Sequence, residues 1–314
     1  MKTLWRFRFI LYRILQMLPV LLAVSVLAFV LSNMSQGDVA SITIRSQGQE
    51  VTEENLAAIR AELGLDKPLA VQYLTWLGKV ARLDFGISFQ TKKPVTEEIF
   101  RRFPATLKLA LAATLISVLF AIPIALLCTR YRNSPFDQVF RVVSACGTTI
   151  PDFWLGLMLL YLFAVQLHLA PVVAGNKWQN ILLPALTLSV NNSAAYIRLL
   201  RENLIKVRGM DYMRAARARG LGEMETLVRH GIKNAMLPCI TLVGVNFGKL
   251  LSGMFACETI FSWNGIGKFA VDSIRLKDIP VIQGYILVVA VTFISINLLL
   301  DILYIYIDPK IQIA

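Results

Sequence analysis

The feature that most constrains this chain of 314 residues is a series of apolar runs, each about 20 residues or longer. An α-helix of that length can cross the hydrocarbon core of a bilayer. Hydrophobic residues make up 56% of the chain, more than a soluble domain can cover with polar surface. We therefore predict an all-α polytopic membrane protein with six transmembrane helices, at about residues 11–31, 105–128, 136–167, 181–200, 237–261 and 281–305.

The third apolar run is too long for one straight crossing. It covers residues 136–167, and Pro151 interrupts it. Proline removes a backbone donor and clashes with the preceding helical turn. A kinked or broken helix is therefore expected near Pro151.

The net charge of +12 follows the loops between the runs. Basic residues precede the first run, follow the second and crowd the segment after the fourth, which by the positive-inside rule places both termini in the cytoplasm. The first run is too long for a cleaved signal peptide. Because the charge follows topology, no nucleic-acid partner is expected.

Four domains are predicted along the chain. Residues 1–31 form the N-terminal cytoplasmic end and the first helix, and residues 32–103 form an extracytoplasmic subdomain. Residues 104–307 form a five-helix core with a cytoplasmic loop over residues 201–236, and residues 308–314 form a cytoplasmic tail.

The polar segment over residues 32–103 carries nine basic and nine acidic residues, a balance suited to the outer side. Thr52 is placed to cap a helix that Gly64 ends. Apolar residues from Tyr73 to Val80 indicate a second helix, and Thr96 is expected to cap another short one. The segment is therefore predicted to be a folded subdomain.

The residues offer no pattern for catalysis. His168 and His230 fall on opposite sides of the membrane in the predicted topology, and the four cysteines lie in or beside apolar runs. No phosphate-binding Gly-x4-Gly-Lys-Ser/Thr motif occurs, so the chain is not expected to bind ATP through a P-loop. Neither an enzyme active site nor a metal site is predicted, and no cofactor is expected on this chain.

Polar residues inside predicted spans are better functional candidates, because burying them in lipid is costly. Asn191 and Asn192 lie in the middle of the fourth span, and Lys249 and Glu258 lie in the fifth. These four are the candidate transport-pathway residues. Hydrogen bonding between helices is an equally good interpretation of the asparagines. Gly244, with the small residues that follow at four-residue spacing, favours close helix packing.

The basic segment over residues 207–238 separates two apolar runs. Small residues recur in it at helical spacing, with arginines beside them. Asp211 is a candidate N-cap, and Gly220 or Gly222 can end the helix in a left-handed turn. A groove could close on such a helix down to its backbone. Binding to the anionic surface of the membrane is the alternative, although the helix lacks the Trp, Phe and Leu side chains that would insert it into lipid.

This segment resembles the signature loop of binding-protein-dependent ABC importer permeases, within the dipeptide, oligopeptide and nickel family. The resemblance rests on Asp211-Tyr212, on the run from Ala216 to Leu221, and on Arg229-His230 followed by Asn234-Ala235 and Pro238. Further segments look similar in the same order: LDFGISF, PATLKLAL, IPDFWLGL, IFSWNGIGKFA, IPVIQGY and IDPKI. Two positions depart from the family pattern, with Arg214 replacing a glutamate and Asn264 replacing a proline.

The resemblance implies a type I ABC importer permease fold in a bacterial cytoplasmic (inner) membrane. It implies a second homologous permease, two ABC ATPases that hold ATP and magnesium, an extracytoplasmic solute-binding protein and surrounding lipid as partners. The coupling helix, which docks into an ATPase, would comprise Asp211, Tyr212, Arg214, Ala215, Ala216, Arg217, Ala218, Arg219, Gly220 and Leu221.

Three segments, VQYLTWL, LDFGISF and PDFWLGL, look most similar to nickel-type permeases. The substrate expected from them is nickel or a nickel or other metal chelate. A di- or oligopeptide is the alternative, since peptide permeases share most of these segments. A stand-alone secondary transporter or channel is a third hypothesis. Inverted repeats with paired broken helices would favour it, but only Pro151 marks a clear interruption.

Overall fold

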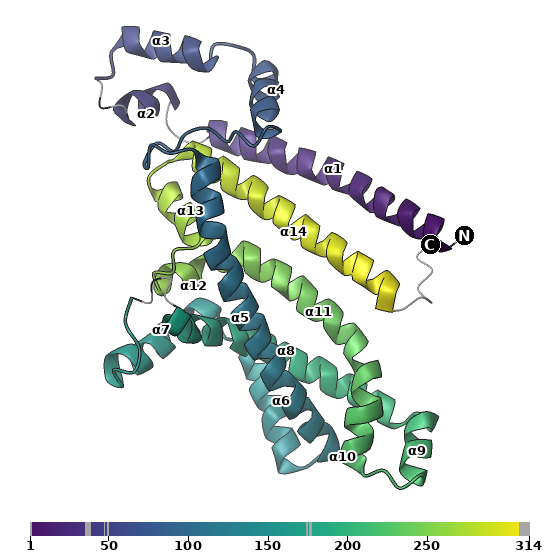
Figure 1. Ribbon diagram of the computed structural model, residues 1–314. Coiled ribbons are helices and arrows are strands. Elements are labelled where there is room, and N and C mark those ends of the chain that lie inside the picture. The colour runs from purple at the N-terminus through teal and green to yellow at the C-terminus, as the bar shows by residue number, and fades with distance from the viewer. Residues whose placement is uncertain are drawn as a thin grey trace. The chain divides into compact units, whose positions relative to one another are not determined.

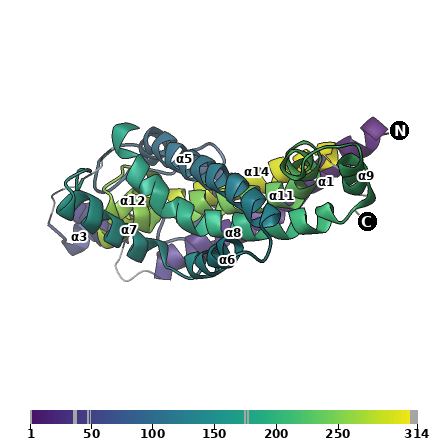
Figure 2. The ribbon, with the colours of Figure 1, turned by 90° about the horizontal axis from the view of Figure 1, so that it is seen from below.

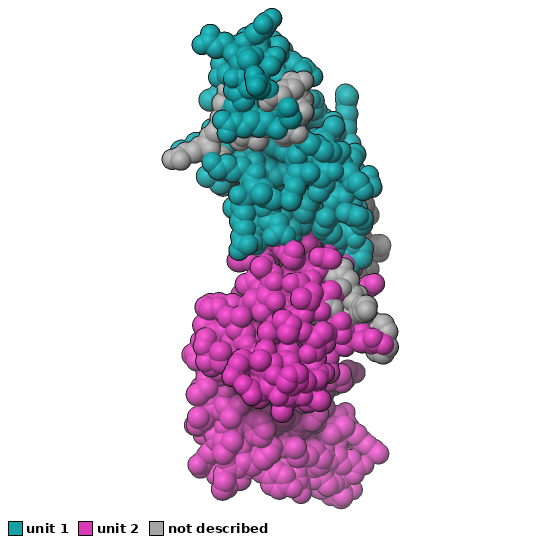
Figure 3. All heavy atoms as spheres, turned by 90° about the vertical axis from the view of Figure 1, so that its left-hand side faces the viewer, with its two compact units in different colours: residues 1–104, 269–294 teal, residues 105–268, 295–314 magenta. Residues whose placement is uncertain are grey.

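The structure is a computed structural model that describes residues 2–34, 39–46, 48, 50–173, 175 and 178–307. Across these residues it forms helices and no strand, apart from an isolated bridge between Ile87 and Pro94. The predicted all-α class is confirmed. The chain forms two compact units, residues 1–104 with 269–294 and residues 105–268 with 295–314 (Figure 3). Their limits differ from the predicted domain boundaries, which stay a prediction, and the predicted tail over residues 308–314 lies outside the described residues.

The first unit contains the segment that is predicted to be an extracytoplasmic subdomain. Its own helices are α1 (Lys2–Met34), α2 (Val39–Ser46), α3 (Glu53–Leu63) and α4 (Leu69–Val80) (Figure 1). Three more helices belong partly to each unit: α5 (Val95–Arg130), α13 (Ile266–Arg275) and α14 (Ile279–Ile307).

Two of the helices predicted within residues 32–103 are confirmed. The Thr52 hydroxyl accepts a hydrogen bond from the Asn55 amide at 3.3 Å, and Gly64 ends α3 with φ of 67°. In α4, Tyr73 packs edge-on against Phe29 of α1 with ring centroids 5.5 Å apart. The apolar face of α4 therefore covers the end of α1.

The predicted short helix at Thr96 is wrong in its extent. Instead of ending before the second span, the helix continues through Pro104 as the 36-residue α5. Thr96 does not cap it; its hydroxyl donates to the carbonyl of Leu83. Pro104 does not interrupt α5, whereas Pro151 does separate two helices.

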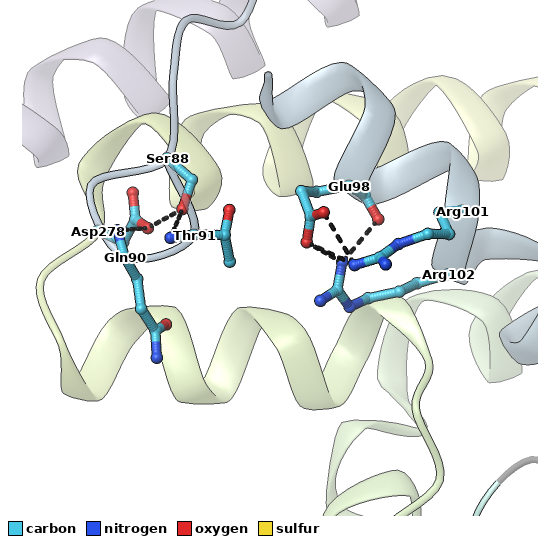
Figure 4. Close-up of polar contacts among 7 residues, drawn as sticks. All are labelled: Ser88, Gln90, Thr91, Glu98, Arg101, Arg102 and Asp278. Atoms are coloured by element: carbon cyan, nitrogen blue, oxygen red, sulfur yellow. Dashed lines mark hydrogen bonds and ion pairs between the residues drawn. The ribbon is translucent and has the colours of Figure 1, made fainter. Parts of the chain in front are cut away.

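Asp278, immediately before α14, organises the turn that contains the LDFGISF segment. Its fully buried carboxylate accepts bonds from the Ser88 hydroxyl at 2.6 Å and from the Gln90 backbone amide at 3.2 Å (Figure 4). It also accepts a bond from the Phe89 backbone amide at 3.1 Å. The same serine oxygen accepts a bond from the Thr91 amide at 3.0 Å. One carboxylate thus bonds a hydroxyl and two backbone amides of a turn about 190 residues away in the chain.

A second buried carboxylate lies in the first turn of α5. Glu98 is fully buried and pairs with Arg101 at 2.8 Å and with Arg102 (Figure 4). The Arg102 guanidinium also stacks on the Phe269 ring, 4.0 Å from its centroid. These contacts neutralise Glu98 and join the start of α5 to α13 within the first unit.

The second unit contains the ten remaining helical elements. They are α6 (Pro135–Gly147), α7 (Asp152–Leu160), the π-helix η1 (Tyr161–Gln166), the 3-10 helix η2 (Trp178–Asn180), α8 (Leu182–Arg208), α9 (Asp211–Ala218), α10 (Glu223–Thr226), the π-helix η3 (Leu227–Gly231), α11 (Ile232–Gly253) and α12 (Phe255–Ile260).

The predicted break near Pro151 is confirmed. The axes of α6 and of the segment Asp152–Gln166 differ in direction by 105°. Helix α6 already ends at Gly147, and Pro151, which is extended with ψ of 133°, is the N-cap of α7.

Helix α8 is the centre of the second unit. It packs against α6, α7 and α11 (Figures 1 and 2). Thirteen of its 27 residues are buried, among them Thr187, Ser189 and Ser193. Protein rather than lipid surrounds much of this helix, which lets it carry polar residues that a lipid-facing helix would not tolerate.

Four described helical stretches are long and apolar enough to cross a membrane, and the bent α6–α7 pair would be a fifth. The four are Leu11–Met34, Val95–Arg130, Glu223–Gly253 and Ile279–Leu303. The predicted fourth span forms as α8 but is too polar to be counted this way. Six transmembrane helices are compatible with this result.

Candidate functional site

The predicted docking loop folds as a short helix between two long ones. Helix α8 ends at Arg208, α9 follows after Met210, and Gly220 takes a left-handed φ of 92° before the chain turns into α10. The predicted ending at Gly220 is confirmed. The predicted N-cap is wrong: Asp211 is the first residue of α9, and Met210 is the N-cap, without a side-chain hydrogen bond.

One face of α9 anchors it to the second unit. Met213 and Ala216 are buried, and Met213 belongs to a cluster with Leu204 of α8 and Leu227 of η3. A Cβ added at Gly231 would lie 3.4 Å from Met213 Cε, so this glycine leaves room for the methionine. Packing of an apolar face is what stabilises so short a helix.

Polar bonds supplement this packing. The Arg217 guanidinium donates to the carbonyl of Arg208 at 3.4 Å, and Arg214 donates to that of Gly209 at 3.3 Å. The side-chain amide of Asn234 donates to the Tyr212 hydroxyl at 2.8 Å. Two arginines thus bond to the last carbonyl of α8 and to that of Gly209, which follows the helix; carbonyls at a helix end have no partner within the helix.

The opposite face of α9 is exposed and made largely of small and basic residues. Asp211 is almost fully exposed, and its ion pair with Arg214, at 3.3 Å, contributes little because solvent screens it. Arg217 and Leu221 are half-buried, and Ala216 is turned inward. The exposed candidates are Asp211, Tyr212, Arg214, Ala215, Ala218, Arg219 and Gly220.

Glu223, which the sequence prediction did not include, joins this loop to the long helices. Its carboxylate pairs with Arg130 at the end of α5, at 3.1 Å, and with Arg208 at the end of α8. Arg208 also donates to the carbonyl of Thr129 at 3.2 Å. Glu223 is one of a few acids in a strongly basic loop, and this minority charge is the signal that the sequence offers. We call Glu223, Arg130 and Arg208 the carboxylate clamp.

The mid-span polar residues do not meet at one site through any hydrogen bond or ion pair in the described ranges. Asn191 and Asn192 are half-buried in α8, and the Asn192 amide donates to the carbonyl of Leu188 in its own helix at 3.1 Å. Lys249 is exposed on α11. The Asn191 side chain is hydrogen-bonded to Asp152 of α7, and Asn192 has its bond within α8, so of these residues Lys249 is the one whose side chain stays available for other contacts among the described residues.

Glu258 has a structural environment. It is fully buried in α12, where it accepts the Thr106 hydroxyl at 2.6 Å and the amide of Lys268 at 2.8 Å. A Cβ at Gly265 would overlap Glu258 Oε1, and one at Gly267 would lie 2.9 Å from Glu258 Oε2. The two glycines of the WNGIG segment therefore let the backbone approach this carboxylate.

A buried ion pair between α6 and α8 was also absent from the prediction. Arg201 donates to both oxygens of Asp137, at 2.5 and 2.6 Å. Asp137 is fully buried and also accepts a hydrogen bond from the backbone amide of Asn133 at 3.0 Å. Bidentate geometry of this kind fixes how the two helices align. Within the described part of the chain, no group of three His, Cys, Asp or Glu side chains is arranged to hold a metal ion.

Comparison with known proteins gives two family matches. Residues 121–313 match the family described as binding-protein-dependent transport system inner membrane component, and residues 6–110 match its N-terminal membrane component. Glutathione transport system permease protein GsiC of Salmonella typhi is 38% identical over 304 residues, covering 97% of this chain and 98% of the relative. The GsiC protein of Escherichia coli is 36% identical over 304 residues with the same coverage.

Proposed function

Because this chain belongs to the family of binding-protein-dependent transport system inner membrane components, we propose that it forms half of the path by which a short peptide is imported. The chain is a multi-pass inner-membrane permease subunit of an ABC importer, and this family is one of transporter components rather than enzymes. The two glutathione permeases among its relatives favour the peptide alternative over nickel.

The exposed face of α9 is the proposed docking surface for an ABC ATPase. Ala215 and Ala218 have no side chain beyond Cβ, so a partner groove can reach the helix backbone. Tyr212, Arg214 and Arg219 surround them and can donate hydrogen bonds or make charged contacts. The buried Met213 face supports this proposal, because it holds α9 to the permease while the other face stays accessible.

The carboxylate clamp is the proposed route from α9 to the transmembrane helices. Movement of the docking loop would act through Glu223 on the ends of α5 and α8, where Arg130 and Arg208 lie. Arg217 adds a direct bond from α9 to α8. Because α8 is the most buried of the long helices in this unit, a shift of its end would reach α6, α7 and α11.

Asn191, Asn192 and Lys249 are the proposed pathway residues. Amides can donate to and accept from peptide groups, and an ammonium can hold a carboxylate. These chemistries suit a peptide better than a bare metal ion, which would need carboxylate, imidazole or thiolate ligands. We assign Glu258 to the junction with Thr106 and not to the pathway, since its oxygens are already bonded.

The proposed assembly contains a second homologous permease, two ABC ATPases and an extracytoplasmic solute-binding protein, in a bacterial cytoplasmic membrane with both permease termini inside. ATP and magnesium would be held by the ATPases. The substrate is tested by reconstituting the complete importer and measuring ATPase stimulation by glutathione, by di- to pentapeptides, by a nickel salt and by nickel–histidine. Peptide stimulation is expected, and stimulation by nickel species alone would contradict the peptide proposal.

Docking is tested by Ala215→Trp, which places an indole on the exposed face without touching Met213. Uptake is expected to fall at least about tenfold, since a bulky residue prevents close approach of the ATPase. The permease should still reach the membrane, as a Western blot of membrane fractions can show. Arg132→Trp, at another exposed position near the end of α5, is the control and should retain uptake; normal uptake by Ala215→Trp would contradict the docking proposal.

The pathway proposal is tested by Lys249→Gln. The KM for peptide uptake should rise about tenfold if the ammonium holds a substrate carboxylate, because one charged hydrogen bond is lost. Lys233→Gln removes a charge from the same helix near its other end and should leave KM unchanged. An unchanged KM in Lys249→Gln would return Lys249 to a structural role.

A further inference from the structure

A cavity of about 160 Å³ lies in the second unit beside the Asp137–Arg201 ion pair. Its walls come from α5, α6 and α8. The lining contains Cys128, Phe140, Arg141, Ser144, Ile197, Arg198, Arg201 and Glu202. Three of these eight residues are arginines and one is acidic, so the lining itself carries an excess of positive charge.

The three arginines are not equivalent. Arg201 is committed to Asp137 through two hydrogen bonds. Arg141 and Arg198, in contrast, are exposed and form neither an ion pair nor a hydrogen bond with any residue that the structure describes. With Asp137 and Glu202 counted against the three arginines, this region has one unbalanced positive charge. Although the charge of Arg141 also acts on Asp137, the hydrogen-bond donors of Arg141 and Arg198 are not used within the described residues and can bind an anion.

Ser144 is a second, independent indication of a ligand. The serine is only 3% exposed, yet its hydroxyl has no hydrogen-bond partner among the described residues. Leaving a buried hydroxyl unpaired costs free energy, so such groups are usually bonded. Because Ser144 lines the cavity, a ligand with an oxygen acceptor would satisfy it.

The surroundings indicate where the ligand comes from. Phe136, Val139, Val142 and Val143 on α6 are exposed apolar residues, as expected of a face in contact with lipid tails. The N-terminal end of α6 follows the basic turn after α5, and this turn is predicted to be cytoplasmic. Basic cavities between membrane helices at this level suit the headgroups of anionic phospholipids.

We propose that this cavity binds a phosphate group, and that an anionic phospholipid of the cytoplasmic leaflet supplies it. Arg141 and Arg198 donate to the phosphate oxygens, and the Ser144 hydroxyl donates to a third position. The bound headgroup would brace α6 against α8 beside the Asp137–Arg201 pair. The lipid source rests on the proposed cytoplasmic orientation, but the phosphate chemistry does not.

The test uses the purified importer complex in detergent and native mass spectrometry. It is titrated separately with dihexanoyl phosphatidylglycerol, dihexanoyl phosphatidylcholine and inorganic phosphate. We expect saturable binding of phosphatidylglycerol, at least about tenfold weaker in the double variant Arg141→Ala/Arg198→Ala, because two charged donors are lost. The charge-matched control Arg132→Ala/Lys206→Ala, at exposed positions outside the cavity, should bind like the wild type.

Ser144→Ala keeps all charges and gives a reading even if the double arginine variant fails to assemble. Its affinity for phosphatidylglycerol should fall about threefold, and the lipid should raise its apparent Tm less than that of the wild type. Wild-type binding by both variants would overturn the site. Equal binding of phosphatidylcholine would overturn the anionic preference, and inorganic phosphate binding as tightly as the lipid would assign the site to a soluble phosphate.

Discussion

Two carboxylates join distant segments in this protein, and their surroundings differ. Asp278 in the first unit is fully buried and accepts from one hydroxyl and two backbone amides. Glu223 in the second unit has a side chain 28% exposed and pairs with two arginines that are each about one-third exposed. One junction is sealed and uses short, fixed donors; the other is open to water and uses long, flexible ones.

This difference indicates which junction can move. Bonds from backbone amides to a buried carboxylate hold one geometry, and leaving any of them unmade is costly. Arginine side chains at the surface can follow a shifted carboxylate, and water can replace them at small cost. The turn at Asp278 is therefore suited to a fixed structure, whereas the carboxylate clamp is suited to the movement that we propose it transmits from α9.

Replacing the sealed carboxylate should have the largest effect. Asp278→Asn places an NH2 group against backbone donors, so we expect a loss of about 3 kcal/mol in the free energy of unfolding. Thermal denaturation of the purified protein would show it as a lower Tm. Glu97→Gln, at an exposed position in α5, is the control; a wild-type Tm for Asp278→Asn would remove the distinction between the junctions.

Replacing the open carboxylate should affect coupling more than stability. Glu223→Gln weakens two partly screened ion pairs, so the free energy of unfolding should change by under about 1 kcal/mol. Peptide imported per ATP hydrolysed is expected to fall about threefold, because the loop loses its tie to α5 and α8.

Salt offers a second measurement on the same junction. Raising ionic strength shortens the range of exposed charges, so wild-type coupling should decline with added salt while that of Glu223→Gln declines less. Coupling that is independent of salt in both proteins would contradict a role for the clamp in transmission.

The smallest effect is expected for the exposed Asp211–Arg214 pair. Asp211→Asn should leave Tm unchanged and uptake within about twofold of wild type, since water surrounds both groups. A large loss of uptake with an unchanged Tm would instead indicate that Asp211 contacts the ATPase directly, and would extend the docking surface to the first turn of α9.

Sequence reasoning located α9 but misassigned one of its ends. Gly220 was recognised because a left-handed turn favours glycine, a property of the residue itself. The preference of aspartate for the N-cap predicts Asp211 there, yet Met210 occupies that position and Asp211 begins the helix. Packing of Met213 and Ala216 against α8 and η3 sets the helix position, and a preference of about 1 kcal/mol for a capping side chain does not override it.

Three features follow from local chemistry and can be predicted from the sequence alone. Long apolar runs require helices in a membrane, and Pro151 interrupts one of these runs. A basic segment rich in small residues forms a short accessible helix. The roles of the carboxylates were not readable, because Asp278, Glu258 and Asp137 take partners between 10 and 190 residues away. Whether an acid in an apolar run lines a path or ties a junction depends on which donors folding brings to it. Glu258 shows this, because only the approach of Thr106 and the glycine-lined turn makes it structural.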